Sequence, residues 1–253
     1  MVPSFCVDCA SLFDSRFFWA LAAAALAGVV RGFSGFGAAL IFVPLGGALY
    51  GPKVAVLILW VIDAVATAPY LPYHFRRAHW QEIVPLIIGS TIALPLGVWI
   101  LVHVDPVPLR WAVCCVVLAS TLGLASGWRY QRQSTTGLSL TVGGVAGLSN
   151  GAVGIGGPPL VLFWLGGQAN SAQTRSNIFT YFALSSVITL ILYLWQGIFT
   201  LPILALGVAL LPAYGIPLLI GDRLFRHATE NWFRRIAFWI CGAAAVMGLP
   251  LWG

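Results

Sequence analysis

Long uncharged apolar stretches constrain the fold of this chain more than any other feature. Each is close to the roughly 20 residues that a helix needs to cross a bilayer, and Asp63 is the only acidic residue within them. Backbone groups in lipid must bond within their own helix, and continuous runs do not fit the alternation of a β-barrel. We therefore predict an all-α polytopic membrane protein. The six clearest stretches are Val54–Tyr73, Ile83–Val102, Leu109–Trp128, Ser176–Trp195, Leu201–Ile220 and Ile236–Trp252.

Composition and charge support this prediction. Only 8% of the 253 residues are charged and 60% are hydrophobic, which excludes an ordinary soluble domain. The net charge of +6 does not indicate a nucleic-acid partner, because the basic residues cluster in short links between apolar stretches. Such links are typical of the cytoplasmic side of a membrane. We expect three links to lie inside: Arg76 and Arg77; Arg129 and Arg132; and Arg223, Arg226, Arg234 and Arg235.

The five cysteines show no zinc-ligand spacing, and no cofactor is predicted. Cys114, Cys115 and Cys241 lie within apolar stretches, where cysteine usually acts as a small buried side chain. Cys6 and Cys9 form a C-x-x-C motif that allows a disulfide if the N-terminus is extracytoplasmic.

A weak internal repeat divides the sequence into two halves. Residues 32–37, Gly-Phe-Ser-Gly-Phe-Gly, match residues 151–156, Gly-Ala-Val-Gly-Ile-Gly. After a slip of one residue, Leu-Gly-Gly at 45–47 matches 165–167. Lys53 and Arg175 then open the next stretch of each half. We expect 1–130 and 131–253 to be two repeats within one membrane domain.

The basic links predict how each half is threaded. With the basic links on the cytoplasmic side, segment 138–167 must begin and end on that side, so it turns back within the membrane. Its arms of about 12 and 10 residues would reach roughly 15–18 Å, near half of a ~30 Å bilayer core. We therefore predict a helical hairpin there, and by symmetry a hairpin at 17–50 that enters from outside. Each half is then one hairpin plus three spans, with opposite topology and both termini extracytoplasmic.

Inverted repeats with broken helices near the midplane are typical of secondary transporters. The alternative interpretation is that the glycines only allow helices to pack closely. On the transporter interpretation, the returning arms start near Ala38 and Pro158, and their N-termini attract anions. The glycines let a ligand approach the backbone, although glycine hairpins in cation carriers use carbonyls instead. The predicted anion site comprises Gly32, Ser34, Gly35 and Gly37 in the first tip and Ser149, Asn150, Gly151, Gly154, Gly156 and Gly157 in the second.

Four further side chains complete the predicted site. Arg31 precedes the first glycine motif, and its guanidinium group suits an oxyanion unless it only caps carbonyls. Arg175 opens a span and would attract anions or anchor the helix at the interface. Asn177 follows on the first turn of that span. Asp63 is a candidate proton carrier or the partner of a buried arginine.

The two glycine motifs resemble those of the sulfite exporter TauE/SafE family. The resemblance rests on residues 32–37 followed by Pro44, on residues 151–158, and on the basic residue that opens each following span. It covers nearly the whole chain, although Phe36 and Ala38 replace part of a longer glycine run. It implies a permease with duplicated halves in the plasma membrane of a bacterium. Such a permease exports sulfite, organosulfonates or related small anions, often with proton coupling.

Two other functions remain open from the sequence alone. An anion channel would conduct through the same site without coupling. A membrane thiol-redox protein would use Cys6 and Cys9, but Cys114 and Cys115 are adjacent within a span, a poor geometry for exchange with a second pair. No nucleotide-binding loop or hydrolase motif is present, so we predict no enzyme activity.

Overall fold

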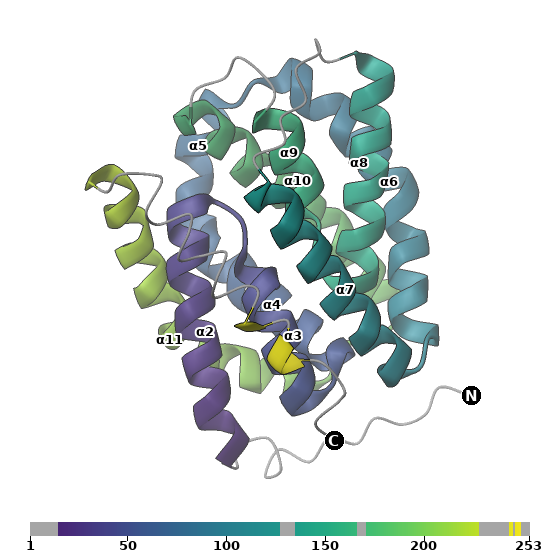
Figure 1. Ribbon diagram of the computed structural model, residues 1–253, viewed down its shortest axis with the longest axis vertical. Helices are drawn as coiled ribbons and strands as arrows, with labels where there is room; N and C mark the ends of the chain where they lie inside the picture. The colour runs from purple at the N-terminus through teal and green to yellow at the C-terminus, as the bar shows by residue number, and fades with distance from the viewer. Residues whose placement is uncertain (1–14, 127–134, 166–170, 228–242, 245, 249–253) are drawn as a thin grey trace.

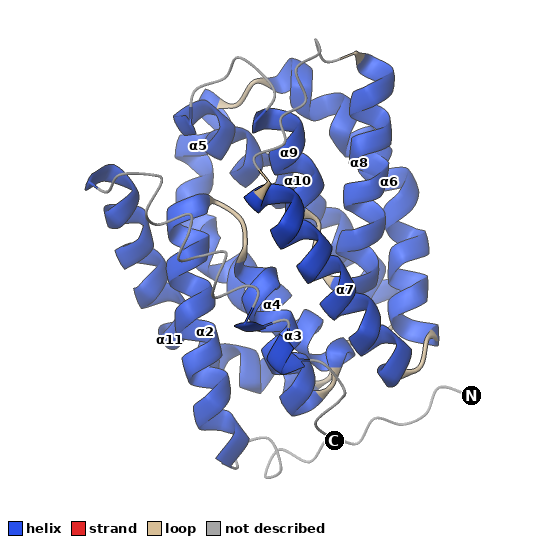
Figure 2. Cartoon of the chain, viewed as in Figure 1, coloured by secondary structure: helices blue, strands red, loops and turns tan. Residues whose placement is uncertain are grey.

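The computed structural model describes residues 15–126, 135–165, 171–227, 243–244 and 246–248. Among these residues it contains only helices and short connecting segments (Figure 2). The helices are α2 (Ser15–Ser34), α3 (Ala38–Tyr50), α4 (Pro52–Thr67), η1 (Ala68–Tyr70), α5 (Leu71–Arg77), α6 (Trp80–His103), α7 (Pro106–Ala125), α8 (Thr136–Val153), α9 (Gly157–Leu165), α10 (Ser171–Trp195) and α11 (Leu201–His227).

Six helical segments of the described chain are long and apolar enough to cross a membrane. Five of them correspond to predicted stretches: α4 continued through α5, and α6, α7, α10 and α11. The sixth is α2, which the sequence analysis treats as one arm of a hairpin. The predicted stretch Ile236–Trp252 lies mostly outside the described residues, as do Cys6, Cys9 and the Arg129–Arg132 link.

The outer surface is apolar, as expected of helices in contact with lipid. Trp19 on α2, Ile92 on α6 and Trp195 at the end of α10 are 70%, 74% and 83% exposed. Large apolar side chains at this level of exposure would be unfavourable in water. The multi-pass membrane assignment therefore follows from both the length of the helices and the surface that they present.

Glycines lie in the contacts of the two most extensively packed helix pairs. α2 packs along α11, and α8 packs along α6. A Cβ atom at Gly28 or Gly32 would collide with the backbone of α11, and one at Gly147 or Gly151 would collide with the backbone of α6. Close backbone approach through small residues spaced by four is a common packing mode of membrane helices. Each pair joins a helix of residues 1–130 to one of residues 131–253, so the two parts of the chain interlock.

Left-handed glycines form the two turns of the glycine motifs. Gly35 and Gly37 have φ values of 78° and 95° between α2 and α3, and Gly154 has a φ of 71° after α8. α3 begins at Ala38 and α9 at Gly157, close to the predicted starts of the returning arms. Figure 1 shows α2 and α8 beginning at opposite ends of the molecule, with both turns in its interior.

The arm before the second turn is longer than predicted. α8 has 18 residues rather than about 12, and α9 has 9. The helix starts early because the Thr135 side chain accepts a hydrogen bond from the Leu138 N–H. It also continues through Gly151, which packs on α6, and ends only at the left-handed Gly154. The glycine motif is therefore mostly helical up to its middle residue.

Candidate functional site

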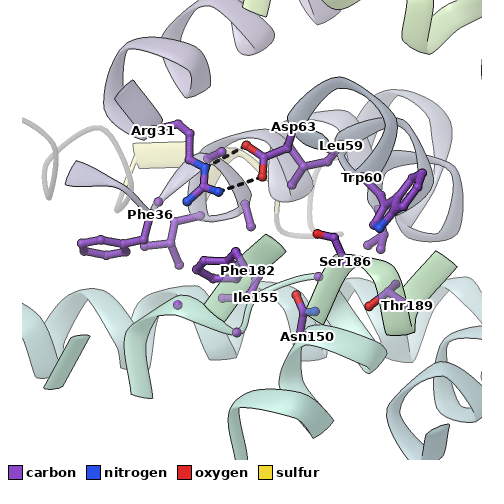
Figure 3. Close-up of a pocket in the computed structure, with 18 of the residues that line it drawn as sticks. Arg31, Phe36, Leu59, Trp60, Asp63, Asn150, Ile155, Phe182, Ser186 and Thr189 are labelled. Carbon is purple, nitrogen blue, oxygen red and sulfur yellow. Dashed lines mark hydrogen bonds and ion pairs between the residues drawn. The ribbon is translucent and has the colours of Figure 1, made fainter. Parts of the chain in front are cut away.

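A cavity of about 70 Å³ lies where the two glycine turns meet. Gly37 and Ala38 line it from the first turn, and residues 154–158 line it from the second. Figure 3 shows side chains of α2 and α4 facing side chains of α8 and α10 across this cavity. The remaining side chains that line it are Arg31, Phe36, Ala39, Leu40, Val56, Leu59, Trp60, Asp63, Asn150, Phe182, Ser186, Thr189 and Tyr193.

Arg31 and Asp63 form a two-pronged ion pair at the edge of this cavity. The Arg31 Nε and Nη2 atoms lie 2.8 and 2.9 Å from the two carboxylate oxygens of Asp63. Tyr214 of α11 donates its hydroxyl to the same carboxylate at 2.5 Å. The Arg31 side chain is 4% exposed and that of Asp63 is 20% exposed, so Asp63 is the partner with more access to the cavity.

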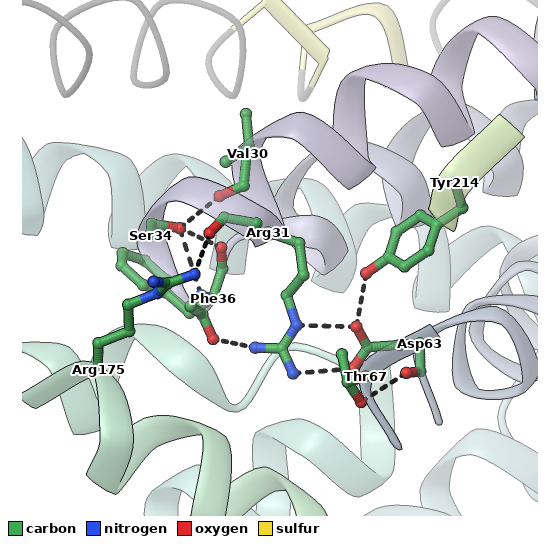
Figure 4. A network of polar contacts seen from close by, with 10 residues as sticks. Val30, Arg31, Ser34, Phe36, Asp63, Thr67, Arg175 and Tyr214 are labelled. Carbon is green, nitrogen blue, oxygen red and sulfur yellow. Dashed lines mark hydrogen bonds and ion pairs between the residues drawn. The ribbon is translucent and has the colours of Figure 1, made fainter. Parts of the chain in front are cut away.

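The Arg31 guanidinium group also contacts the first turn and two aromatic rings. Its Nη1 atom donates to the Gly35 carbonyl (Figure 4). Its Cζ atom lies 4.9 Å from the centre of the Phe179 ring and 5.0 Å from that of Phe182. Of the five N–H groups of an arginine, these contacts use three: two to Asp63 and one to Gly35. The other two N–H groups, one on Nη1 and one on Nη2, are not used by these contacts.

The second part of the chain repeats this arrangement without charge. Asn150, which matches Arg31 in the sequence repeat, donates to the Ser185 hydroxyl of α10 at 3.3 Å. Thr189 bonds back to the Ser185 carbonyl at 2.8 Å, as Thr67 bonds back to the Asp63 carbonyl at 2.7 Å. The cavity therefore has a charged wall on one side and a neutral hydrogen-bonding wall on the other.

The structure brings together seven of the predicted site residues. These are Arg31, Gly37, Asp63, Asn150, Gly154, Gly156 and Gly157. Gly32 and Gly151 instead face the backbones of α11 and α6. Gly35 and Ser34 belong to the first turn, where the Ser34 hydroxyl lies 2.7 Å from the Val30 carbonyl oxygen. Ser149 accepts the Ile155 N–H through its carbonyl, closing the second turn.

Two predicted residues lie away from this cavity. Asn177 holds the start of α6: its carbonyl oxygen accepts the His79 N–H at 2.9 Å, and its amide nitrogen lies 3.2 Å from a Glu82 carboxylate oxygen. Arg175 pairs with Asp222 at 2.6 Å and lines a different cavity. Their predicted substrate contacts would therefore require a site other than the one between the turns.

Asp222 corrects one statement of the sequence analysis. The predicted span ends at Ile220 and leaves Asp63 as the sole acid in any span, but α11 continues to His227. Asp222 therefore lies within a membrane-length helix and is buried. Trp60, Tyr193 and Tyr214 were also missed, because aromatic residues within apolar helices carry no sequence signal that separates a cavity wall from a core. Their position depends on which helices become neighbours.

No group of three or more His, Cys, Asp and Glu side chains in the described ranges could hold a metal ion. Cys114 and Cys115 are free thiols on α7, one buried and one exposed. The polar groups of the cavity can instead bind a small anion through Arg31, Asn150, hydroxyl groups and the N-terminal ends of α3 and α9.

Comparison with known proteins supports this interpretation. The family model described as "Sulfite exporter TauE/SafE" matches residues 20–248. The chain is 23% identical over 224 residues to the "Probable sulfite/organosulfonate exporter TauE" of Cupriavidus necator, covering 86% of this chain and 88% of that protein. No solved structure matches the chain.

Proposed function

Because this chain belongs to the sulfite exporter TauE/SafE family, we propose that it is a secondary transporter that exports a small sulfur oxyanion, sulfite being the substrate that its cavity fits best. The observation that carries the proposal is the cavity between the two turns, with one guanidinium group at its edge. An anion there would meet the Arg31 guanidinium group and the N-terminal ends of α3 and α9.

The size of the cavity favours a small inorganic anion over an organosulfonate. A water molecule needs roughly 10–15 Å³ of such volume, so a cavity of about 70 Å³ holds about five water-sized groups. Sulfite has four heavy atoms and fits this space. Sulfoacetate has eight and would require the aromatic wall at Trp60, Phe182 and Tyr193 to move. We therefore expect sulfite to be the preferred substrate of the arrangement seen here.

Asp63 would couple the anion to a proton. The Asp63 carboxylate occupies the Nε and Nη2 edge of Arg31, where an oxyanion would bind with the same two-pronged geometry. Carboxylate and substrate therefore compete for this edge of Arg31. Protonation of Asp63 removes its charge and frees the edge, with the Tyr214 hydroxyl and the Thr67 side chain beside it. Proton and anion would then bind together and move together, and export would be driven by the outward gradient of the anion.

An inverted arrangement of residues 1–130 and 131–253 would provide alternating access to this site. It is supported by the two glycine turns and by α2 and α8 beginning at opposite ends of the molecule (Figure 1). It is also supported by the packing of α2 on α11 and of α8 on α6, in which a helix of each part contacts a helix of the other part. In this proposal the chain lies in the plasma membrane of a bacterium, with the basic links inside and both termini outside. Rocking of one part against the other would expose the cavity to each side in turn.

A flux assay in proteoliposomes tests the proposal. Purified protein should carry radiolabelled sulfite faster than sulfoacetate or acetate, measured against protein-free liposomes at the same pH. An inward proton gradient should accelerate sulfite entry if the two move together. Arg31→Gln should abolish the protein-dependent flux, whereas Arg16→Gln, outside the cavity lining at the other end of α2, should leave it unchanged. Equal flux for Arg31→Gln and the wild type would refute this assignment of the site.

A further inference from the structure

A second and larger cavity lies between α5, the beginning of α10 and the end of α11. Its volume is about 650 Å³, and the polar side chains along it include His74, Arg77, Gln173, Arg175, Ser176 and Asp222. Arg76 and Arg77 on α5 and Arg223 on α11 belong to the basic links that we place on the cytoplasmic side. The cavity therefore lies at the end of the molecule from which an exported anion would enter.

Arg175 is buried in the wall of this cavity with one donor unused. Its side chain lies among α2, α10 and α11, and the residue is only 7% exposed. The Nη2 atom donates to the Asp222 carboxylate at 2.6 Å and to the Gly32 carbonyl of the first turn. The Nε atom is buried and has no hydrogen-bond partner. A buried donor without a partner is costly, and a ligand oxygen would remove that cost if a small movement of the Arg175 side chain turned this donor toward the cavity.

The charge of the cavity is positive. Arg77 and Arg175 face one carboxylate, Asp222, which Arg175 already engages. Arg77 is exposed and forms no ion pair with any described residue; its guanidinium group lies 4.5 Å from the centre of the Tyr73 ring. Ser176 adds a hydroxyl group that lies 3.1 Å from His74 Nδ1. The cavity thus offers one uncompensated cation at its surface and one buried donor in its wall.

Phe179 lies between the guanidinium groups of Arg31 and Arg175. Its ring lies 5.4 Å from the Arg175 Cζ atom and 4.9 Å from the Arg31 Cζ atom. His74 stacks on the same ring at 4.3 Å. The two arginines also bind carbonyls close to the first turn: Arg175 binds that of Gly32 in the last helical turn of α2, and Arg31 binds that of Gly35. One aromatic ring and one turn therefore separate a guanidinium group in each cavity.

From these contacts we propose that the second cavity is a separate binding site for a small oxyanion, which binds between Arg77 and Arg175. The substrate would bind here first and then pass Phe179 to reach the cavity at Arg31. The proposal rests on the proposed transport function for the identity of the anion. The site itself follows from the unused Arg175 donor, the unpaired Arg77 charge and the polar wall. An anion at Arg175 would also weaken the hold of Arg175 on the Gly32 carbonyl and so loosen the turn that closes the next cavity.

Equilibrium binding to the detergent-purified protein tests the second site. Sodium sulfite and sodium sulfate serve as probes, with sodium chloride of equal ionic strength as the baseline. The wild type should bind two anions per chain, and Arg31→Gln should retain one. Arg77→Gln should weaken the other at least about tenfold, the effect of losing roughly 1.4 kcal/mol of a charged contact. Arg76→Gln is the matched control, because Arg76 is exposed on the same helix and does not line the cavity.

Arg175→Lys tests the buried donor. It keeps the charge beside Asp222 but removes the Nε donor, so the second anion should bind more weakly in a folded protein. Identical binding by Arg77→Gln and Arg76→Gln, or one anion per wild-type chain, would overturn the second site while leaving the transport proposal intact. Arg77-dependent binding without sulfite flux would instead refute the transport proposal and retain the site. Absence of binding in the wild type would overturn both.

Discussion

Variants that break the Arg31–Asp63 pair distinguish a substrate-binding role of Arg31 from a purely structural role. Asp63→Asn removes the charge that faces Arg31, whose side chain is 4% exposed. An uncompensated buried charge costs about 3–5 kcal/mol. The Gly35 carbonyl and the Phe179 and Phe182 rings remain around Arg31, and cation–π contacts contribute ~0.5–2 kcal/mol each. We therefore expect Asp63→Asn to lose less than the full ~3–5 kcal/mol and to stay folded.

Arg31→Gln should cost less than Asp63→Asn. The remaining Asp63 side chain is 20% exposed toward the cavity and keeps its hydrogen bond from Tyr214. A carboxylate with that access and that hydrogen bond is less costly to leave unpaired than a guanidinium group that is 4% exposed. Arg31→Gln should therefore stay folded and lose anion binding, while Asp63→Asn should stay folded, bind anions and lose the proton dependence of flux.

Sulfite should stabilise Asp63→Asn more than the wild type. In this variant the Nε and Nη2 edge of Arg31 is released from its carboxylate, so the anion binds without competition. A ligand at 100 times its dissociation constant stabilises the folded state by ~2.7 kcal/mol. The assay is the midpoint of thermal unfolding in detergent, measured with sulfite and with chloride of equal ionic strength. Arg31→Gln should show no shift attributable to this site.

The double variant decides between the two roles. If the pair were purely structural, Arg31→Gln with Asp63→Asn would restore the folded yield lost in the single variants, because neither buried charge would remain. Sulfite would then stabilise none of the three proteins. Rescue of the yield, together with the absence of sulfite stabilisation in Asp63→Asn, would refute both the substrate role of Arg31 and the coupling role of Asp63.

Three further predictions address the packing, the cavity wall and the topology. Gly143→Ala should lower the thermal midpoint and the folded yield, because the added Cβ atom would collide with the Leu86 backbone of α6. Gly144→Ala should lower neither, because the nearest atom to its added Cβ is 3.8 Å away. Equal midpoints for the two variants would show that α6 and α8 do not pack closely. Trp60→Ala should enlarge the cavity and raise sulfoacetate flux relative to sulfite, while Trp99→Ala, 51% exposed on α6, should leave the ratio unchanged. A cysteine introduced at Gln133 should react only with membrane-permeant thiol reagents in intact cells, and labelling by an impermeant reagent from outside would overturn the inverted topology.

Hydrophobic patterning predicted the helices well and their ends poorly. Five spans could be placed from apolar length alone, because a bilayer sets the minimum length of a crossing helix. The extent of α8 could not, since its glycines look like a break in sequence but are accommodated by packing on α6. Asp222 was missed for a similar reason: α11 extends past the apolar run, and Arg175 neutralises the acid inside it.

The sequence by itself determined that this chain is a helical membrane protein with two glycine turns, a few charged residues among apolar helices and a resemblance to a transporter family. These properties follow from local composition, because helix formation in lipid and turns at left-handed glycines need no distant partner. Only the tertiary structure decided that Arg31 meets Asp63 across 32 positions, that Arg175 meets Asp222 across 47, and that the two arginines line different cavities. Such pairings depend on which helices become neighbours, and here close contacts between glycines and helix backbones, α2 on α11 and α8 on α6, set that choice.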